Sequence, residues 1–94
     1  MLVLLAGRAE MTIAQAFGKV LQEAREARQL SQEELAFQSG YHRTFISLLE
    51  RGLRTPTLTT IINFSSALQI PASELIAKVE MRLHDFQSEE LGKA

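Results

Sequence analysis

The chain has 94 residues, which is enough for one small domain with a single hydrophobic core. Apolar residues make up 46% and charged residues 22%, ordinary values for a globular protein. The sequence has no cysteine, which excludes disulfides, thiolate metal sites and thiol catalysis and is compatible with a cytoplasmic location. It also has no cofactor-binding motif and no cluster of metal ligands, so no cofactor or metal is expected.

The net charge of −1 is unusual for a nucleic-acid-binding protein, but the charges are unevenly distributed. Residues 41–55 contain three arginines, Arg43, Arg51 and Arg54, and one acid, Glu50. Residues 73–94 contain five acids and three bases. Contact with phosphate depends on the local charge, so the middle of the chain is a candidate phosphate-binding surface.

Residues 1–11 are expected to form an N-terminal arm. The apolar run Leu2–Ala6 is far shorter than the ~18–20 residues of a membrane-spanning helix, and it lacks the basic flank of a signal peptide. No association with a membrane is therefore expected. Two interpretations of residues 1–10 stay open: a leader translated from an upstream start codon, or a short arm that packs on a neighbour.

The first predicted helix covers residues 12–28. Thr12 and Gln15 have the spacing of a capping box, which indicates the N-terminus of a helix. Gly18 lies inside the helix at a cost of roughly 1 kcal/mol relative to alanine, and it is a candidate for close approach by another helix. The apolar residues recur at helical spacing and form one stripe, which consists of Ile13, Ala16, Phe17, Val20, Leu21 and Ala24.

Two short helices joined by a tight turn are predicted between residues 32 and 52. Ser31 and Glu34 form a second capping box, and Gly40 ends the first of these helices. The second helix runs from about residue 43 to residue 51, with Ile46 and Leu49 on its inner side. The helical period puts four polar residues on its outer side, namely Arg43, Thr44, Ser47 and Arg51. This pattern predicts a helix-turn-helix whose outer face is free to enter the major groove of DNA.

Two further helices are predicted after Pro56 and after Ile70. The first is capped by Thr57, and its predicted buried side consists of Leu58, Ile61, Ile62, Phe64, Ser65 and Leu68. The second begins near Pro71, and its apolar stripe consists of Leu75, Ile76, Val79, Leu83 and Phe86. This stripe is longer than a small bundle needs, so Leu75, Val79, Leu83 and Phe86 are predicted to form a dimer interface. The domain then spans residues 12–87, and residues 88–94 form a polar tail.

These motifs resemble the Cro/repressor-type (XRE-like) transcription regulators over residues 14–80. The similarity is greatest to restriction–modification controller proteins and phage-type repressors. It is carried by Phe17-Gly18, Arg25, Leu30-Ser31-Gln32-Glu33-Glu34-Leu35-Ala36, Gly40, Arg43-Thr44-Phe45-Ile46-Ser47, Glu50-Arg51-Gly52 and Pro56. The chain departs from this pattern at Gln29, where the family often has glycine at the end of the first helix. The resemblance implies an all-α, five-helix, lambda-repressor-like domain that binds double-stranded DNA as a symmetric homodimer.

The resemblance also implies roles for individual residues. Arg43, Thr44 and Ser47 would face the edges of bases, and Gln32 and Arg51 would contact phosphates. Arg25 and Glu50 would form a structural ion pair between the first and third helices.

Chemical arguments from the residues themselves add to these roles. A guanidinium at Arg43 can bind guanine O6 and N7 in a bidentate manner. Arg54 and His42 are further candidates for phosphate contact. For each of these side chains, a solvated position on the surface is the alternative interpretation.

The function predicted from the sequence is therefore a homodimeric, sequence-specific regulator that binds a palindromic or pseudo-palindromic operator. The alternative is an antitoxin or another protein-interaction module that uses the same fold to bind a protein partner. Catalysis is not expected, because no nucleophile–base pair or phosphate-binding glycine loop is present.

Overall fold

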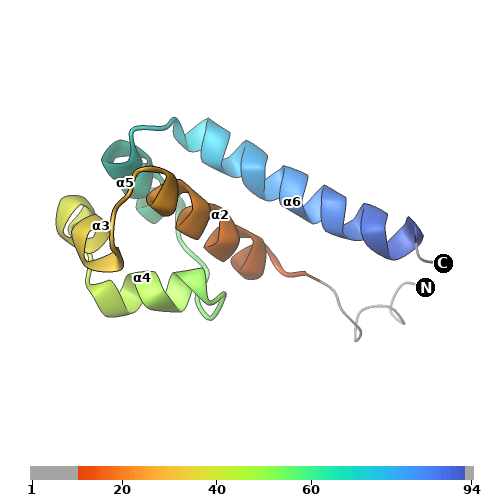
Figure 1. Cartoon of the computed structure of the whole chain (residues 1–94), viewed down its shortest axis with the longest axis horizontal. Helices are drawn as coiled ribbons and strands as arrows, with labels where there is room; N and C mark the ends of the chain where they lie inside the picture. The colour runs from red at the N-terminus through yellow and green to blue at the C-terminus, as the bar shows by residue number, and fades with distance from the viewer. Residues whose placement is uncertain (1–10, 93–94) are drawn as a thin grey trace.

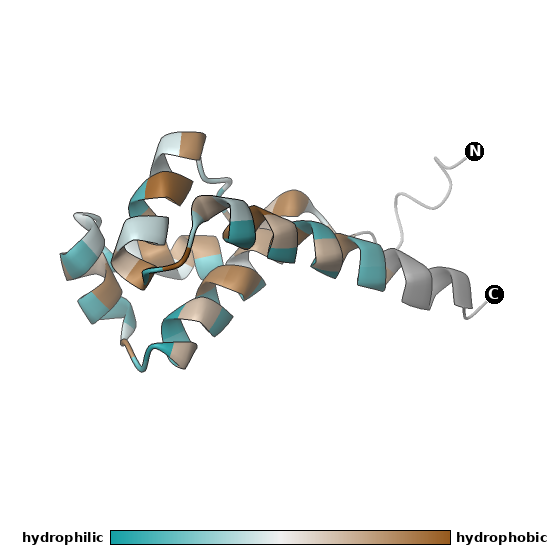
Figure 2. Cartoon of the chain, turned by 90° about the horizontal axis from the view of Figure 1, so that it is seen from above, coloured by the Kyte–Doolittle hydropathy of each residue, from teal (hydrophilic) through white to brown (hydrophobic). Residues whose placement is uncertain are grey.

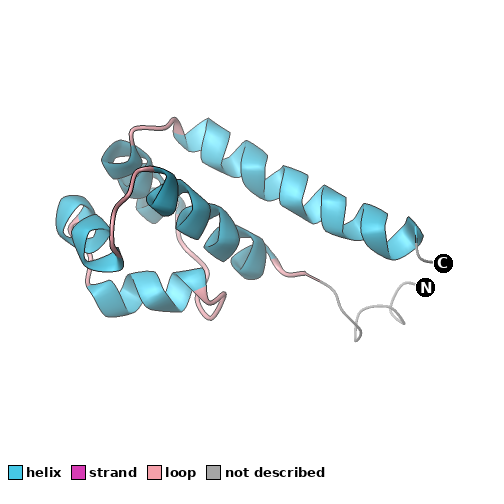
Figure 3. Cartoon of the chain, in the orientation of Figure 1, coloured by secondary structure: helices cyan, strands magenta, loops and turns pink. Residues whose placement is uncertain are grey.

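The computed structural model describes the backbone of residues 11–92 and the side chains of residues 11–86. Its five helices match the predicted all-α fold (Figures 1 and 3). With the labels of Figure 1, these helices are α2 (Ile13–Ala27), α3 (Gln32–Ser39), α4 (Arg43–Glu50), α5 (Leu58–Leu68) and α6 (Ala72–Gly92). Helix α2 lies between α4 and α6 and packs against both. Helix α3 packs against α4 and α5, and α5 packs against α6.

The predicted helix N-termini are confirmed by their caps. Thr12 Oγ1 accepts a hydrogen bond from the Gln15 N–H at 3.0 Å, and the Thr12 N–H donates to Gln15 Oε1 at 2.9 Å. Ser31 and Glu34 form the same reciprocal pair at the start of α3. Thr57 caps α5 by accepting from the Thr60 N–H at 3.1 Å. These caps satisfy first-turn amides that have no acceptor within the helix.

Left-handed residues end four of the helices, including α4, where Gly52 follows the C-cap with a φ of +74°. Gly40 ends α3 with a φ of +80°, as expected for glycine at this position. Gln29, directly after the C-cap of α2, and Gln69, the C-cap of α5, each adopt a φ of +59°. The departure at Gln29 therefore leaves the helix end in place, and a side chain occupies a conformation that glycine adopts more easily.

The core contains apolar residues from every helix, and in Figure 2 hydrophobic and hydrophilic residues alternate along the helices. The predicted burial is wrong for Ile13, Leu58 and Ile62, which are exposed. In α5, Phe64 and Leu68 are buried as predicted, and Thr60 is buried with them. Ile62 lies two residues from both Thr60 and Phe64 and therefore on the opposite side of the helix, because 3.6 residues make one turn. The core itself consists of Ala16, Phe17, Val20, Leu21, Leu35, Ala36, Ile46, Leu49, Phe64, Leu68, Leu75 and Val79.

Gly18 marks the place where α2 and α4 come closest. A Cβ atom on Gly18 would meet the backbone carbonyl oxygens of Leu49 and Glu50, the second at 2.8 Å. These are backbone atoms, which cannot swing away as the end of a side chain can. The predicted close approach is thus confirmed, and it fixes how α4 lies on the domain.

Helix α6 continues to Gly92, so the expected boundary between residues 87 and 88 does not coincide with the end of the helix. The expected arm at residues 1–10 lies outside the described residues. Among residues 11–92, no helix combines the length and the apolar character that crossing a membrane requires.

Candidate DNA interface

The helix-turn-helix is formed by α3, a short turn and α4. The turn begins at Gly40, and the N–H groups of Gly40 and Tyr41 both donate to the Ala36 carbonyl oxygen, at 2.9 and 3.0 Å. Ile46 and Leu49 hold the inner side of α4 in the core. The opposite side of α4 is therefore presented away from the domain.

Tyr41 anchors this turn to α5, a role that the sequence did not reveal. Its ring packs against Phe45 and Phe64, with ring centroids 5.3 and 5.2 Å away. Its hydroxyl donates to Thr60 Oγ1 at 3.2 Å and accepts from Asn63 Nδ2 at 2.9 Å. Its hydrogen-bond partners lie 19 and 22 residues further along the chain, so no local pattern could have indicated them.

The outer side of α4 carries the residues predicted to face DNA bases. Arg43 and Thr44 are exposed in the first turn, and Ser47 is half-buried one turn later. His42 is the N-cap residue but makes no side-chain capping hydrogen bond. The first-turn amides of α4 consequently lack a side-chain acceptor at the positive end of the helix dipole, where an anion is favoured.

Two exposed arginines lie beyond the C-terminal end of this helix. Arg51 donates from Nε to the Ser47 carbonyl oxygen at 3.3 Å. The guanidinium carbon of Arg54 lies 5.6 Å from the centre of the Phe45 ring, which is a cation–π distance. Both cations are therefore held beside α4, although neither contact was predicted from the sequence.

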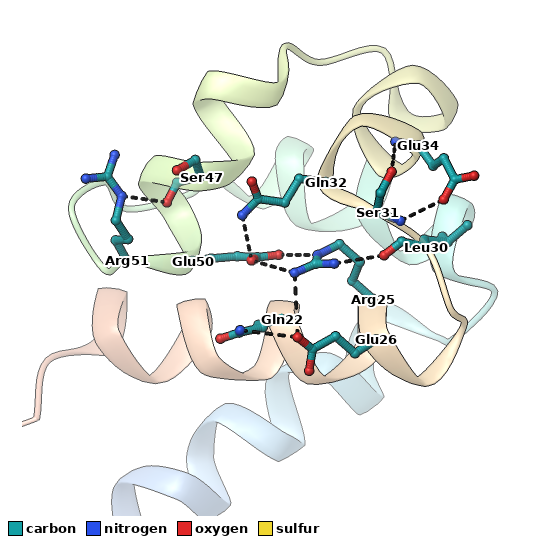
Figure 4. A network of polar contacts seen from close by, with 10 residues as sticks. All are labelled: Gln22, Arg25, Glu26, Leu30, Ser31, Gln32, Glu34, Ser47, Glu50 and Arg51. Atoms are coloured by element: carbon teal, nitrogen blue, oxygen red, sulfur yellow. Dashed lines mark hydrogen bonds and ion pairs between the residues drawn. The ribbon is translucent and has the colours of Figure 1, made fainter.

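The predicted ion pair between Arg25 and Glu50 is present and belongs to a larger network (Figure 4). Arg25 donates from Nε to Glu50 Oε2 at 2.7 Å and from its second terminal nitrogen to Glu50 Oε1 at 3.0 Å. Its remaining nitrogen donates to the Leu30 carbonyl oxygen at 2.8 Å. The hydrogen bond to Glu50 raises the pKa of the Arg25 guanidinium, and its charged form is stabilised accordingly.

Gln32 joins the same network. Its Nε2 donates one of its two N–H groups to Glu50 Oε1 at 3.0 Å, and the other stays a candidate phosphate donor. The backbone N–H of Gln32 is in the first turn of α3 and stays a candidate phosphate donor. The network links α2, α3 and α4 through one carboxylate.

This arrangement also explains how a chain of net charge −1 presents a basic surface. Glu50 is the only acid among residues 41–55, and its side chain is 5% exposed and paired with Arg25. Arg43, Arg51 and Arg54 are exposed on and beside α4. The exposed charged side chains of residues 41–55 are therefore all positive, as contact with a phosphate backbone requires.

The residues predicted to form a dimer interface divide into two groups. Leu75 and Val79 are 0% and 8% exposed and pack in the core of a single chain. This use in the core replaces their predicted role at an interface. Leu83 and Phe86 are half-buried.

Within the described part of the chain, no three His, Asp or Glu side chains come together as metal ligands.

The helix-turn-helix family model (HTH_3) matches residues 21–75. Control protein C.BamHI of Bacillus amyloliquefaciens is 39% identical over 61 residues, which cover 64% of this chain and 75% of that protein. Control protein C.SmaI of Serratia marcescens is 37% identical over 68 residues, covering 72% of this chain and 81% of that protein.

Among solved structures, the restriction-modification controller protein C.AhdI from Aeromonas hydrophila superposes with a TM-score of 0.64. It is 44% identical, and the match covers 66% of this chain and 94% of that chain. The family model spans more than half of the sequence and includes the whole of α3, the turn and α4. The chain therefore belongs to the helix-turn-helix family of XRE-like DNA-binding transcription regulators.

Proposed function

We propose that the protein binds a two-fold symmetric operator as a homodimer and regulates transcription from a neighbouring promoter. The observation that carries this proposal is the set of exposed arginines on and beside α4, where Glu50, the only acid among residues 41–55, is paired with Arg25. Such a surface attracts the phosphate backbone while α4 enters the major groove.

The residues divide by role according to their place on this surface. Arg43, in the first turn of α4, binds guanine, and Thr44 and Ser47 contact neighbouring bases. The phosphate contacts set the position of the helix on the duplex. They come from four residues, namely His42, Arg51, Arg54 and the backbone N–H of Gln32.

The dimer interface is assigned to the exposed side of α5. Leu58 and Ile62 are 65% and 52% exposed and lie one turn apart on the same side of the helix. Helix α5 follows α4 directly in the chain, so an interface here brings two copies of α4 close to a common two-fold axis. The two recognition helices then lie ~34 Å apart, as successive major grooves require.

The target genes are inferred from the relatives. C.BamHI and C.SmaI are control proteins, and C.AhdI is a restriction-modification controller protein. A role in controlling restriction–modification genes is therefore the first biological context to examine for this chain.

The experiment is in-vitro selection of DNA from a random library with wild type, Arg43→Ala and Lys78→Ala. We expect wild type to enrich a two-fold symmetric site. Arg43→Ala should lose preference at one base pair per half-site, because a bidentate contact contributes about 1–3 kcal/mol of discrimination. Lys78 is exposed on α6, on the far side of α2 from α4, so its variant should select the wild-type site.

Two outcomes would contradict the proposal. If wild type enriches no sequence at low or moderate salt, the fold serves another purpose, and binding to a protein partner replaces operator binding. If Arg43→Ala and Lys78→Ala weaken the sequence preference equally, α4 is not the helix that contacts the bases.

A further inference from the structure

An open groove lies between α2 and the second half of α6. It has a volume of about 400 Å³, and its apolar lining comes from Met11, Val20, Met81 and Phe86. Met81 is 63% exposed, and Phe86 is half-exposed. Val20 is a core residue and Met11 packs against the core, so the groove exposes the edge of the core on the side of α2 away from the proposed DNA-binding surface.

Charged residues border this apolar lining. Arg82 of α6 forms an ion pair with Glu23 of α2, and both residues line the groove. Lys78 and Asp85 are exposed on α6 and also line it. An apolar strip between charged borders suits a short extended peptide, because apolar side chains can fill the strip while the charges stay in water.

We propose that residues Leu2–Ala6 of the same chain occupy this groove. They form a run of five consecutive apolar residues, and they are followed by Gly7, which permits a reversal of the chain. Met11 is itself part of the lining, so the segment is attached at the edge of the groove. Ten extended residues reach up to ~33 Å, which is ample for a site that begins at residue 11.

The arrangement of the helices favours this occupant over a second copy of the chain. Helices α2 and α6 run in opposite directions, so the start of α2 and the second half of α6 lie at the same end of the molecule (Figure 1). A segment tethered at Met11 is present at an effective concentration in the millimolar range, which a separate molecule does not reach in dilute solution. The proposal is independent of DNA binding.

Disulfide trapping tests the proposal directly, because the native chain has no cysteine. The test variant is the full chain with Leu4→Cys and Met81→Cys. The matched control is Leu4→Cys with Ile13→Cys, since Ile13 is equally exposed at 63% but does not line the groove. Ile13 is also much closer to Leu4 in sequence, so a freely moving arm would form the Leu4–Ile13 bridge faster.

We expect an intramolecular bridge to Met81→Cys that forms at least ~10 times faster than the bridge to Ile13→Cys, reversing the order that tether length alone dictates. The product should have the mass of a single chain on a denaturing gel. A faster bridge to Ile13→Cys would overturn the proposal. Covalent dimers of the Met81→Cys variant would overturn it as well and would assign the groove to a second copy.

A second measurement uses the melting temperature of single variants in the arm. Leu4→Asp should lower the Tm by about 5 °C, because it places a charge against the apolar lining, whereas Ala9→Asp, outside the apolar run, should leave the Tm unchanged. If Leu4→Asp and Ala9→Asp have the same Tm, residues Leu2–Ala6 do not occupy the groove. Operator binding by Leu4→Asp, measured in parallel, shows whether the DNA-binding domain has kept its fold.

Discussion

At the residue scale, Glu50 is the side chain on which most of the helix-turn-helix depends. It accepts hydrogen bonds from Arg25 and from Gln32, and no buried polar side-chain atom in the described part of the chain lacks a partner. A buried ion pair of this kind contributes little when intact compared with an apolar substitute, but breaking it leaves an uncompensated charge.

We therefore expect Glu50→Ala to lower the free energy of unfolding by about 3–5 kcal/mol, because Arg25 is left buried without its partner. Glu50→Gln keeps one oxygen acceptor and should lose less, about 1–3 kcal/mol. Urea unfolding of the two variants measures both values. If Glu50→Ala lowers the free energy of unfolding by less than Glu50→Gln does, the network is not a structural unit.

Local interactions between side chains and backbone could be predicted from the sequence. The capping boxes at Thr12 and Ser31 involve residues three positions apart, so their geometry follows from the helix itself. The contact of Arg54 with Phe45 and the hydrogen bonds of Tyr41 depend on how the elements pack, and no sequence spacing encodes them. The hydrogen bond from Gln32 to Glu50 was not predicted for the same reason, because Glu50 lies on another helix.

At the scale of the elements, the ends of α2 and α5 carry strain that glycine would relieve. Gln29 and Gln69 both have left-handed backbones, a conformation that costs an L-residue about 1–2 kcal/mol relative to glycine. Part of this difference is offset because glycine has more conformational freedom in the unfolded chain. Gln29→Gly and Gln69→Gly should each raise the free energy of unfolding by about 0.5–1 kcal/mol.

The control for these variants is Gln38→Gly, an identical substitution in the exposed part of α3. There the backbone is helical, so glycine should lower the free energy of unfolding by roughly 1 kcal/mol. Thermal melting of the three variants under one set of conditions gives the comparison. Destabilisation by all three would contradict the expectation for the helix ends.

The crossing of α2 and α4 provides a second test at this scale. Gly18→Ala should lower the free energy of unfolding by about 1–3 kcal/mol, since the new methyl group meets backbone carbonyl oxygens of α4. This loss opposes the gain of ~1 kcal/mol that alanine brings to an isolated helix. Chemical denaturation of the variant shows whether its free energy of unfolding falls or rises.

Gly40→Ala serves as the comparison for this variant. A Cβ atom there has open space around it, so only the left-handed φ of +80° opposes the substitution. We expect a loss of about 1–2 kcal/mol with no change in how α4 lies on the domain. A stabilised Gly18→Ala variant would show that α4 can shift away at little cost.

At the scale of the whole molecule, the sequence predicted the number and order of the helices but only part of the inner side of α5, where Phe64 and Leu68 are buried as predicted and Thr60 was missed. Leu58 and Ile62 are apolar and suggested burial, yet Thr60 takes the inner position because Thr57 and Tyr41 satisfy its hydroxyl. Helix α5 carries apolar residues on more than one side, so their spacing did not decide which side faces the core. Only the packing of α3 and α6 against α5 selects between them.

The exposed side of α5 leads to a prediction about assembly. Ile62→Glu should shift the protein from dimer to monomer, because it places a charge in the centre of the proposed interface. Operator affinity should fall with it, since each subunit then binds its half-site alone. Sedimentation equilibrium and gel-shift titration measure the two effects. Ser73→Glu, an exposed position on α6 with the same change in charge, should remain dimeric.

The two sides of α4 have a consequence for how such a protein changes over evolutionary time. Ile46, Leu49 and Glu50 face the domain, while Arg43 and Thr44 are exposed on the same eight-residue helix. Substitutions at the exposed positions therefore leave the folded state almost untouched. New target sequences are accessible to this lineage by mutations that do not pass through unstable intermediates, and paralogues can diverge in the sites they regulate while retaining one scaffold.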